Sequence, residues 1–187
     1  MRVIAGSAKS LPLKTLRGNT TRPTTDRIKE TLFNIISADI PDCRFLDLFS
    51  GSGGIGIEAL SRGASEAVFD EQDRAAVQVI RHNLRFTHLE DRARIIGMDA
   101  VKAVDTLRGE VPFNVIFMDP PYDHDLERRV LEALSTNSAA DEHTLIIIEA
   151  SMETDFSYLG SLGYEMKREK NYGSNRHIFV KKLTEEK

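Results

Sequence analysis

The chain has few of the features that mark secreted or membrane-bound proteins. It contains one cysteine, Cys43, so it cannot form an internal disulfide. No segment reaches the ~18 consecutive apolar residues that a bilayer-spanning helix requires. Residues 1–6 carry no long apolar stretch of the kind found in signal peptides. We therefore expect a cytoplasmic protein with no membrane association.

Internal repeats, low-complexity tracts and an interdomain linker are also absent from the sequence. Its 187 residues fit one domain, or one domain with a small appendage, and an apolar content of 41% is enough for a core. We expect an N-terminal arm over residues 1–20 and an α/β domain over residues 21–187. Within the arm, two short strands flank a Gly-Ser-Ala-Lys turn and predict a β-hairpin.

Charge is distributed unevenly, although the net value is only −4. Residues 1–37 carry seven basic side chains against two acidic ones, a net of +5, so the remaining residues sum to −9. A second basic cluster lies near the C-terminus, opposed by Glu169, and consists of Lys167, Arg168, Lys170, Arg176, Lys181 and Lys182. An acidic body with two basic patches favours a protein that meets a polyanion on one face.

A helix is predicted to open at residues 22–27, and from Arg44 onward short apolar strands alternate with amphipathic helices. Strands are predicted at 45–49, 67–69, 93–96, 115–118 and 145–148, with two more at 163–167 and 177–182. Alternation of strand and helix predicts a parallel sheet with helices on both faces. The last two strands are joined by a short connection and therefore pair antiparallel. The expected fold is a mostly parallel seven-stranded sheet with an antiparallel C-terminal strand pair.

A glycine loop follows the first of these strands. Gly51, Gly53 and Gly56 match the spacing of a nucleotide-binding turn between a strand and a helix. Glycine is needed there because the backbone must approach a ligand without a Cβ in the way. Glu71 follows Gly51 by 20 residues, at the tip of the next strand, where it can accept hydrogen bonds from ribose hydroxyls. The first half of the sheet is therefore expected to bind an adenosine-containing cofactor.

The choice among such cofactors depends on what surrounds the loop. ATP is disfavoured because no Gly-Lys-Ser/Thr sequence is present to grip phosphates. NAD would require a second region for its substrate, and little chain is left for one. S-adenosyl-L-methionine fits better, since Asp47 and the glycine loop can hold its methionine end and Glu71 its ribose. Asp99, after the third strand, can accept from the adenine amine and can also cap the following helix.

The sequence Asp119-Pro120-Pro121-Tyr122 follows the fourth strand, whose residues are all apolar. Asp119 supplies an acceptor at the carboxyl end of a strand, where open α/β sheets hold their ligands. The prolines stiffen the backbone, and the carbonyl of Pro120 can face a ligand. Tyr122 adds a flat ring with a polar tip. This combination suits a planar group that carries an exocyclic amine.

Residues 45–64, 69–73 and 119–122 resemble the class I S-adenosylmethionine-dependent methyltransferases, which have a Rossmann-like fold. Residues 1–6 and 22–34 extend the similarity to the bacterial RsmD family over nearly the whole chain. This resemblance implies methylation of the exocyclic N2 amine of a guanine (position 966) in 16S rRNA. The partner would be the small ribosomal subunit or an assembly intermediate, and we expect a monomer without a bound metal.

Under this interpretation the catalytic residues are Asp119, Pro120 and Tyr122. The target base leaves its stack, Tyr122 stacks on it, and the Asp119 carboxylate and Pro120 carbonyl accept from the amine. Basic residues of the arm and the first helix hold the RNA backbone. They are Arg2, Lys9, Lys14, Arg22 and Arg27, with Lys29 beside them.

Two other functions remain open from the sequence. One is DNA adenine-N6 methylation, which uses the same tetrapeptide but usually needs a sizeable target-recognition domain that this chain lacks. The other is a non-catalytic RNA-binding assembly factor, which the intact Gly51, Gly53, Glu71 and Asp119 speak against. The tetrapeptide by itself does not distinguish guanine from adenine.

Overall fold

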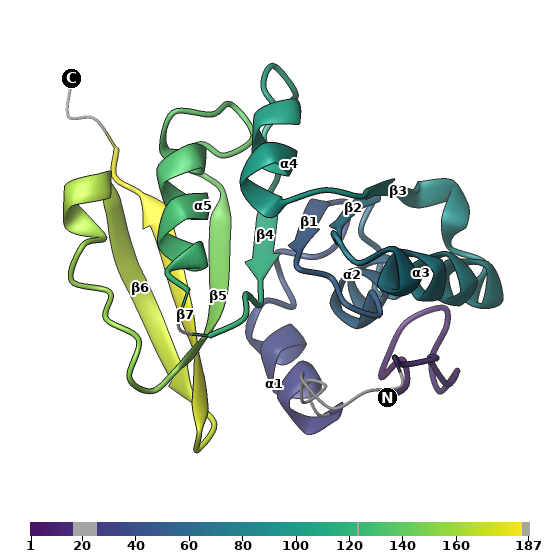
Figure 1. The fold of residues 1–187 in the computed structure, drawn as a ribbon. Coiled ribbons are helices and arrows are strands. Elements are labelled where there is room, and N and C mark those ends of the chain that lie inside the picture. Colours follow the sequence, from purple (N-terminus) through teal and green to yellow (C-terminus); the bar gives the residue numbers. More distant parts are fainter. Residues whose placement is uncertain (17–25, 123, 185–187) are drawn as a thin grey trace.

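A computed structural model describes residues 1–16, 26–122 and 124–184, and Figure 1 shows one twisted sheet with helices packed on it. The strands are β1 (Arg44–Leu48), β2 (Glu66–Asp70), β3 (Ala93–Ile96), β4 (Val115–Met118), β5 (Leu145–Ser151), β6 (Tyr164–Asn171) and β7 (Asn175–Lys182). The α-helices are α1 (Asp26–Ile35), α2 (Gly54–Ser61), α3 (Arg74–Thr87), α4 (Ala100–Thr106) and α5 (Leu126–Ser135). Two short 3-10 helices span Glu90–Arg92 and Gly160–Leu162.

The sheet has the strand order β3-β2-β1-β4-β5-β7-β6. Strands β1 to β5 pair in parallel, and β7 pairs antiparallel with both β5 and β6. The prediction of a mostly parallel seven-stranded sheet with an antiparallel C-terminal pair is confirmed. The strand order reverses between β1 and β4, and such a switch point is where open α/β sheets bind their ligands, at the carboxyl ends of the strands.

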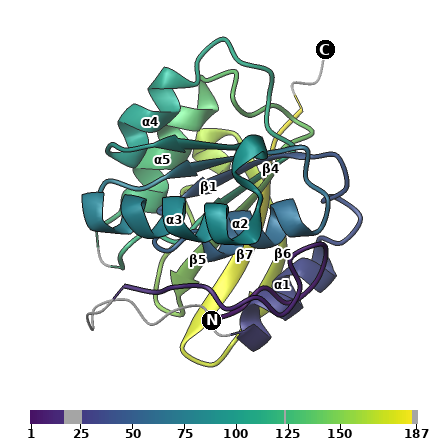
Figure 2. The ribbon, with the colours of Figure 1, turned by 90° about the vertical axis from the view of Figure 1, so that its right-hand side faces the viewer.

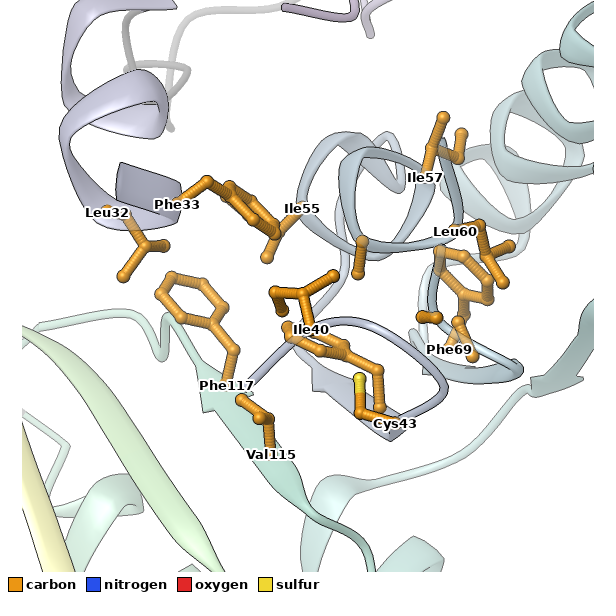
Figure 3. Packing of buried hydrophobic residues seen from close by; sticks show 14 of the residues in the cluster. Leu32, Phe33, Ile40, Cys43, Ile55, Ile57, Leu60, Phe69, Val115 and Phe117 are labelled. Carbon is orange, nitrogen blue, oxygen red and sulfur yellow. The ribbon is translucent and has the colours of Figure 1, made fainter. Parts of the chain in front are cut away.

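Each face of the sheet carries its own buried core. On one face Phe45, Phe69 and Phe117 pack against α1, α2 and α3. Figure 3 shows Phe33 of α1 and Ile57 of α2 among the side chains gathered over this face. On the other face alternate residues of the same strands pack against α4 and α5, among them Leu46, Leu48, Ile116 and Met118. Burial on both faces explains why these strands consist mostly of apolar residues, with Asp47 of β1 and Asp70 of β2 as buried exceptions.

The N-terminal segment pairs antiparallel with itself, as expected for a hairpin, but it packs on the body of the protein. Its described residues, 1–16, contain an antiparallel bridge between Arg2 and Pro12, flanked by a hydrogen bond from the Val3 N–H to the Leu11 carbonyl at 3.0 Å, and residues 17–20 lie outside the described part. Val3, Ala8 and Leu13 are buried in the core beside α2 and α3. The segment therefore lies along the body of the protein, as Figure 2 shows, because its apolar side chains gain more from burial than from projecting into solvent.

Side chains of the helices bind this docked segment. The Glu58 carboxylate of α2 accepts hydrogen bonds from the backbone N–H groups of Ile4 and Ala5, at 2.8 and 3.0 Å. Asn83 of α3 accepts from the Lys14 N–H at 2.9 Å and donates to the Lys14 carbonyl at 3.0 Å. Backbone groups of Ile4, Ala5 and Lys14 are thus paired with side chains of α2 and α3.

Among the residues that the structure describes, no helix combines the length and the apolar character that crossing a membrane would require.

Candidate active site

The glycine loop joins β1 to α2 through a tight turn in the left-handed backbone region. Phe49 (φ 60°), Gly51 (φ 55°) and Gly53 (φ 79°) all lie there, and only glycine adopts this conformation without strain. Gly56 is required for a different reason, since a Cβ at that position would come within 2.3 Å of the Phe69 ring. The loop glycines therefore shape the turn, and Gly56 allows α2 to approach the sheet closely.

Asp47 lies beneath the loop on β1, with 1% of its surface exposed. Its Oδ2 accepts a hydrogen bond from the Gly56 N–H at 2.9 Å. Burial raises the pKa of Asp47 to about 7, with smaller contributions from the nearby Glu71 and Asp70, while the Gly56 hydrogen bond opposes the rise. A buried carboxylate of this kind is stabilised when a cation or a further hydrogen-bond donor binds beside it.

Glu71 links the end of β2 to the glycine loop. Its carboxylate accepts from the Gly51 N–H and from the Asp73 N–H, both at 2.9 Å. The neighbouring Asp70 is 1% exposed, and its Oδ1 has no hydrogen-bond partner among the described residues. Burial raises the pKa of Asp70 to about 7. Of the two acids, Glu71 binds the loop through its side chain, whereas Asp70 contacts it through its backbone carbonyl, which accepts from the Ser50 N–H at 2.9 Å.

Asp99 follows β3 and caps α4. Its Oδ1 accepts from the backbone N–H groups of Val101 and Lys102, at 3.2 and 3.3 Å. Asp99 is half-buried and follows β3, whose carboxyl end lies at the same edge of the parallel sheet as that of β1, where the glycine loop begins. Capping therefore fixes the direction of a carboxylate that lies beside the cofactor region.

Asp119 directly follows β4, and Tyr122 lies three residues further along. Burial raises the pKa of Asp119 well above its usual value, and the negative charges of Glu149 and Asp47 raise it further. Tyr122 is 42% exposed, so its ring is available for stacking. Its hydroxyl hydrogen-bonds with the Asn175 side chain, yet burial and nearby negative charge raise its pKa to about 12, which keeps the phenol protonated at neutral pH.

Two functional candidates were not identified from the sequence: Glu149 on β5 and His177 on β7. They face each other in the sheet register, and Glu149 Oε2 lies 3.2 Å from His177 Nε2. Glu149 Oε1 also accepts from the Asn175 amide at 2.5 Å. The sequence did contain a clue to Glu149. It directly follows the apolar residues 145–148, just as Asp119 directly follows the apolar residues 115–118.

The basic residues expected to bind RNA differ in their exposure to solvent. Arg2, Lys9, Lys14 and Arg27 are exposed, and Arg22 lies outside the described residues. Lys29 differs from the expectation because its side chain is fully buried: Nζ lies 3.3 Å from Glu58 and donates to the Arg2 carbonyl at 2.6 Å. Burial lowers the pKa of Lys29, although Glu58 opposes the change. Lys29 therefore holds the N-terminal segment in place and does not face RNA.

Comparison with known sequences assigns the chain to a family. A family model described as "Conserved hypothetical protein 95" matches residues 1–181. The chain belongs to this family. A putative rRNA methyltransferase of Bacillus subtilis is 38% identical over 184 residues, covering 97% of this chain and 99% of the relative. The ribosomal RNA small subunit methyltransferase D of Escherichia coli K12 is 36% identical, covering 82% and 76%. These relatives confirm the resemblance to the RsmD family.

Solved structures give the same result for the fold. A putative methyltransferase from Escherichia coli superposes with a TM-score of 0.83 at 32% identity, covering 99% of each chain. A putative RNA methyltransferase from Pyrococcus horikoshii superposes with a TM-score of 0.74 at 16% identity, covering 94% of this chain and 93% of that one. The second match, at low identity, shows that the Rossmann-like fold is shared. The chain has the class I methyltransferase fold.

Proposed function

We propose that this protein transfers a methyl group from S-adenosyl-L-methionine to the exocyclic N2 amine of a guanine in 16S rRNA. The observation that carries the proposal is the position of Asp119 and Tyr122 at the carboxyl end of β4, beside the buried Asp47 and the glycine loop bound by Glu71. The names of the relatives, an rRNA methyltransferase and a small subunit methyltransferase, support RNA as the substrate.

The residues of the cofactor region fit S-adenosylmethionine. Asp47 is a buried carboxylate, and burial raises its pKa to about 7, so a cationic ligand beside it would stabilise the charged form. Gly51 and Gly53 leave the loop backbone open to the methionine end, Glu71 is placed for the ribose hydroxyls, and Asp99 for the adenine amine. When bound, the cofactor supplies an electrophilic methyl group on a sulfonium, and its transfer leaves a neutral thioether.

Asp119, Pro120 and Tyr122 would act on the base. The ring of Tyr122 stacks on a base that has left the helix, and the Asp119 carboxylate and Pro120 carbonyl accept from its two amine N–H groups. These contacts direct the nitrogen lone pair toward the methyl group, so most of the rate gain comes from positioning. The nitrogen loses one proton as it gains the methyl group. The Asp119 carboxylate is the acceptor beside it, and its raised pKa favours that transfer.

Exposed Arg2, Lys9, Lys14 and Arg27, together with Arg22, would contact phosphates of the RNA. Such contacts position the substrate without reading its sequence, so the surrounding fold of the small subunit or of an assembly intermediate would select the site. A monomer acting in the cytoplasm is consistent with this scheme.

Labelled S-adenosylmethionine should be incubated with the protein and with naked 16S rRNA, small subunits lacking the modification, or DNA. Label in guanine N2 of 16S rRNA, lost in Asp119→Ala and kept in the exposed control Asp91→Ala, supports the proposal. Label in DNA adenine would support the competing methyltransferase function. Tight RNA binding without any methyl transfer would indicate a non-catalytic assembly factor.

A further inference from the structure

A second carboxylate lies next to Asp119 on the adjacent strand. Strands β4 and β5 run in parallel with Met118 opposite Ile148, so the residues that follow, Asp119 and Glu149, are lateral neighbours. Adjacent strands lie about 4.8 Å apart. Phe117 and Ile147, two residues earlier, pack in the same buried cluster, and alternation along a strand therefore directs both carboxylates to that same face.

The orientation of Glu149 is fixed by two side chains of β7. Asn175 donates to Oε1 at 2.5 Å, and His177 Nε2 lies 3.2 Å from Oε2. Asn175 also hydrogen-bonds with the Tyr122 hydroxyl, so the carboxylate and the stacking ring are linked through one amide. Glu149 is 5% exposed, which leaves little room for the side chain to move.

The surroundings of His177 make its ring a hydrogen-bond donor to Glu149. His177 is fully buried, and its Nδ1 has no hydrogen-bond partner among the described residues. A protonated ring would bury an unsatisfied Nδ1–H, whereas a neutral ring can donate Nε2–H to Glu149 and leave Nδ1 without a proton. The Tyr172 ring lies against the imidazole, with 4.8 Å between ring centroids. His177 thus acts as a fixed donor to the carboxylate.

We propose that Glu149 and Asp119 form an acceptor pair that selects guanine, with Asp119 on the N2 amine and Glu149 on the N1–H. This inference rests on the proposed function and deepens it. The relevant edge of guanine carries two adjacent donors, N1–H and the N2 amine. Adenine instead carries an acceptor, N1, beside its amine. A carboxylate facing that acceptor is repelled, so the pair supplies the discrimination that the Asp-Pro-Pro-Tyr sequence lacks.

The probe for this inference is 2-aminopurine, which keeps the 2-amine but has an acceptor at N1. Small subunits assembled in vitro from 16S rRNA with guanine or 2-aminopurine at the methylated position serve as paired substrates. For the native protein we expect kcat/KM on guanine to exceed that on 2-aminopurine by about 10- to 100-fold, the range for a hydrogen bond to a charged group. In Glu149→Gln this ratio should fall several-fold or more, because the amide can donate to an N1 acceptor.

Glu153→Gln is the matched control, since Glu153 is exposed just beyond the same strand and should leave the ratio unchanged. A Glu149→Gln protein that methylates both substrates more slowly but keeps the native ratio would overturn the inference, because that outcome indicates a purely structural role. Full native activity and selectivity in Glu149→Gln would overturn it equally.

A second variant covers the case in which Glu149→Gln fails to fold, as judged by its thermal unfolding. Asn175→Ala removes one of the two donors that orient Glu149. The ratio of kcat/KM on guanine to that on 2-aminopurine should therefore decrease but stay above one. An unchanged preference in that variant counts against the inference. Failure of the proposed function is a separate result: the native protein would then leave guanine-containing small subunits unmethylated. If the native protein methylates guanine but neither variant changes the ratio of kcat/KM on guanine to that on 2-aminopurine, only the acceptor pair is contradicted.

Discussion

Glu71 accepts a hydrogen bond from the Gly51 backbone N–H at 2.9 Å, which ties the end of β2 to the loop that follows β1. The same carboxylate accepts from Asp73 at the start of α3. One side chain therefore shapes the glycine loop and presents a carboxylate toward the expected ribose position.

Replacing Glu71 with alanine should weaken S-adenosylmethionine binding by about 10- to 100-fold, because hydrogen bonds to a charged group and the shape of the loop are lost together. Isothermal titration calorimetry measures the affinity directly. Glu90→Ala, at an exposed position after α3, serves as the control and should bind normally. An unchanged affinity in Glu71→Ala would show that the ribose is held elsewhere.

Asp47 and Asp70 should both destabilise the ligand-free protein at neutral and higher pH. Burial raises the pKa of each carboxyl to about 7 in the folded state, well above its ordinary value, so the folded protein binds these protons more tightly than the unfolded chain. The free energy of unfolding should therefore fall as pH rises from about 4 to about 7 and stay low above that. Asp47→Asn and Asp70→Asn should each raise the melting temperature at pH 8. Each should also reduce the decrease in the free energy of unfolding between pH 4 and pH 7.

The two variants are expected to differ in function, which makes each a control for the other. Asp47→Asn should lose affinity for S-adenosylmethionine, because the amide no longer offers a charge to a cationic ligand. Asp70→Asn should keep that affinity, since the Glu71 side chain binds the loop, whereas Asp70 contacts it only through a backbone carbonyl that the substitution leaves in place. Thermal melts across pH 4–8 and binding titrations test both statements. Equal loss of affinity in the two variants would give Asp70 a role in the cofactor site.

Glu58→Ala should destabilise the fold strongly. Glu58 pairs with the buried Lys29 at 3.3 Å and accepts from the Ile4 and Ala5 N–H groups. Removing it leaves a buried cation with only a carbonyl partner, a change that typically costs about 3–5 kcal/mol. Chemical denaturation measures this cost, and limited proteolysis should show cleavage near the N-terminus. The exposed Glu30→Ala should change neither, and a loss under about 1 kcal/mol would contradict the expectation.

The double variant Lys9→Ala and Lys14→Ala should weaken binding to rRNA while leaving S-adenosylmethionine affinity and stability intact. Both side chains are exposed on the docked segment. If each contacts one phosphate, the slope of log affinity against log salt should decrease by about 2 in magnitude. Filter binding over a salt series checks this. Lys167→Ala, on exposed β6, tests whether the C-terminal basic cluster contributes as well, and an unaltered slope in the double variant would place the RNA elsewhere.

Local sequence patterns were sufficient for much of the fold. The bounds of β3 (Ala93–Ile96) and β4 (Val115–Met118) agree with the predicted ones, and for β4 the reason is that Pro112 and Pro120 lie on either side of its apolar run. The sequence predicted the antiparallel pairing within the N-terminal segment, but not that the segment packs against helices. Its apolar residues are buried by α2 and α3, which are distant in the sequence.

The sequence by itself determined the elements, the glycine loop and the reactive end of β4, since each depends on residues within a few positions of one another. Tertiary structure alone decided which side chains share the site. Glu149 and His177 are 28 positions apart and meet only because β7 pairs antiparallel with β5. The same pairing brings Asn175 to Glu149, while the parallel register of β4 and β5 places Asp119 beside it. Strand register is fixed by packing of the whole sheet between its two cores, which no local pattern records.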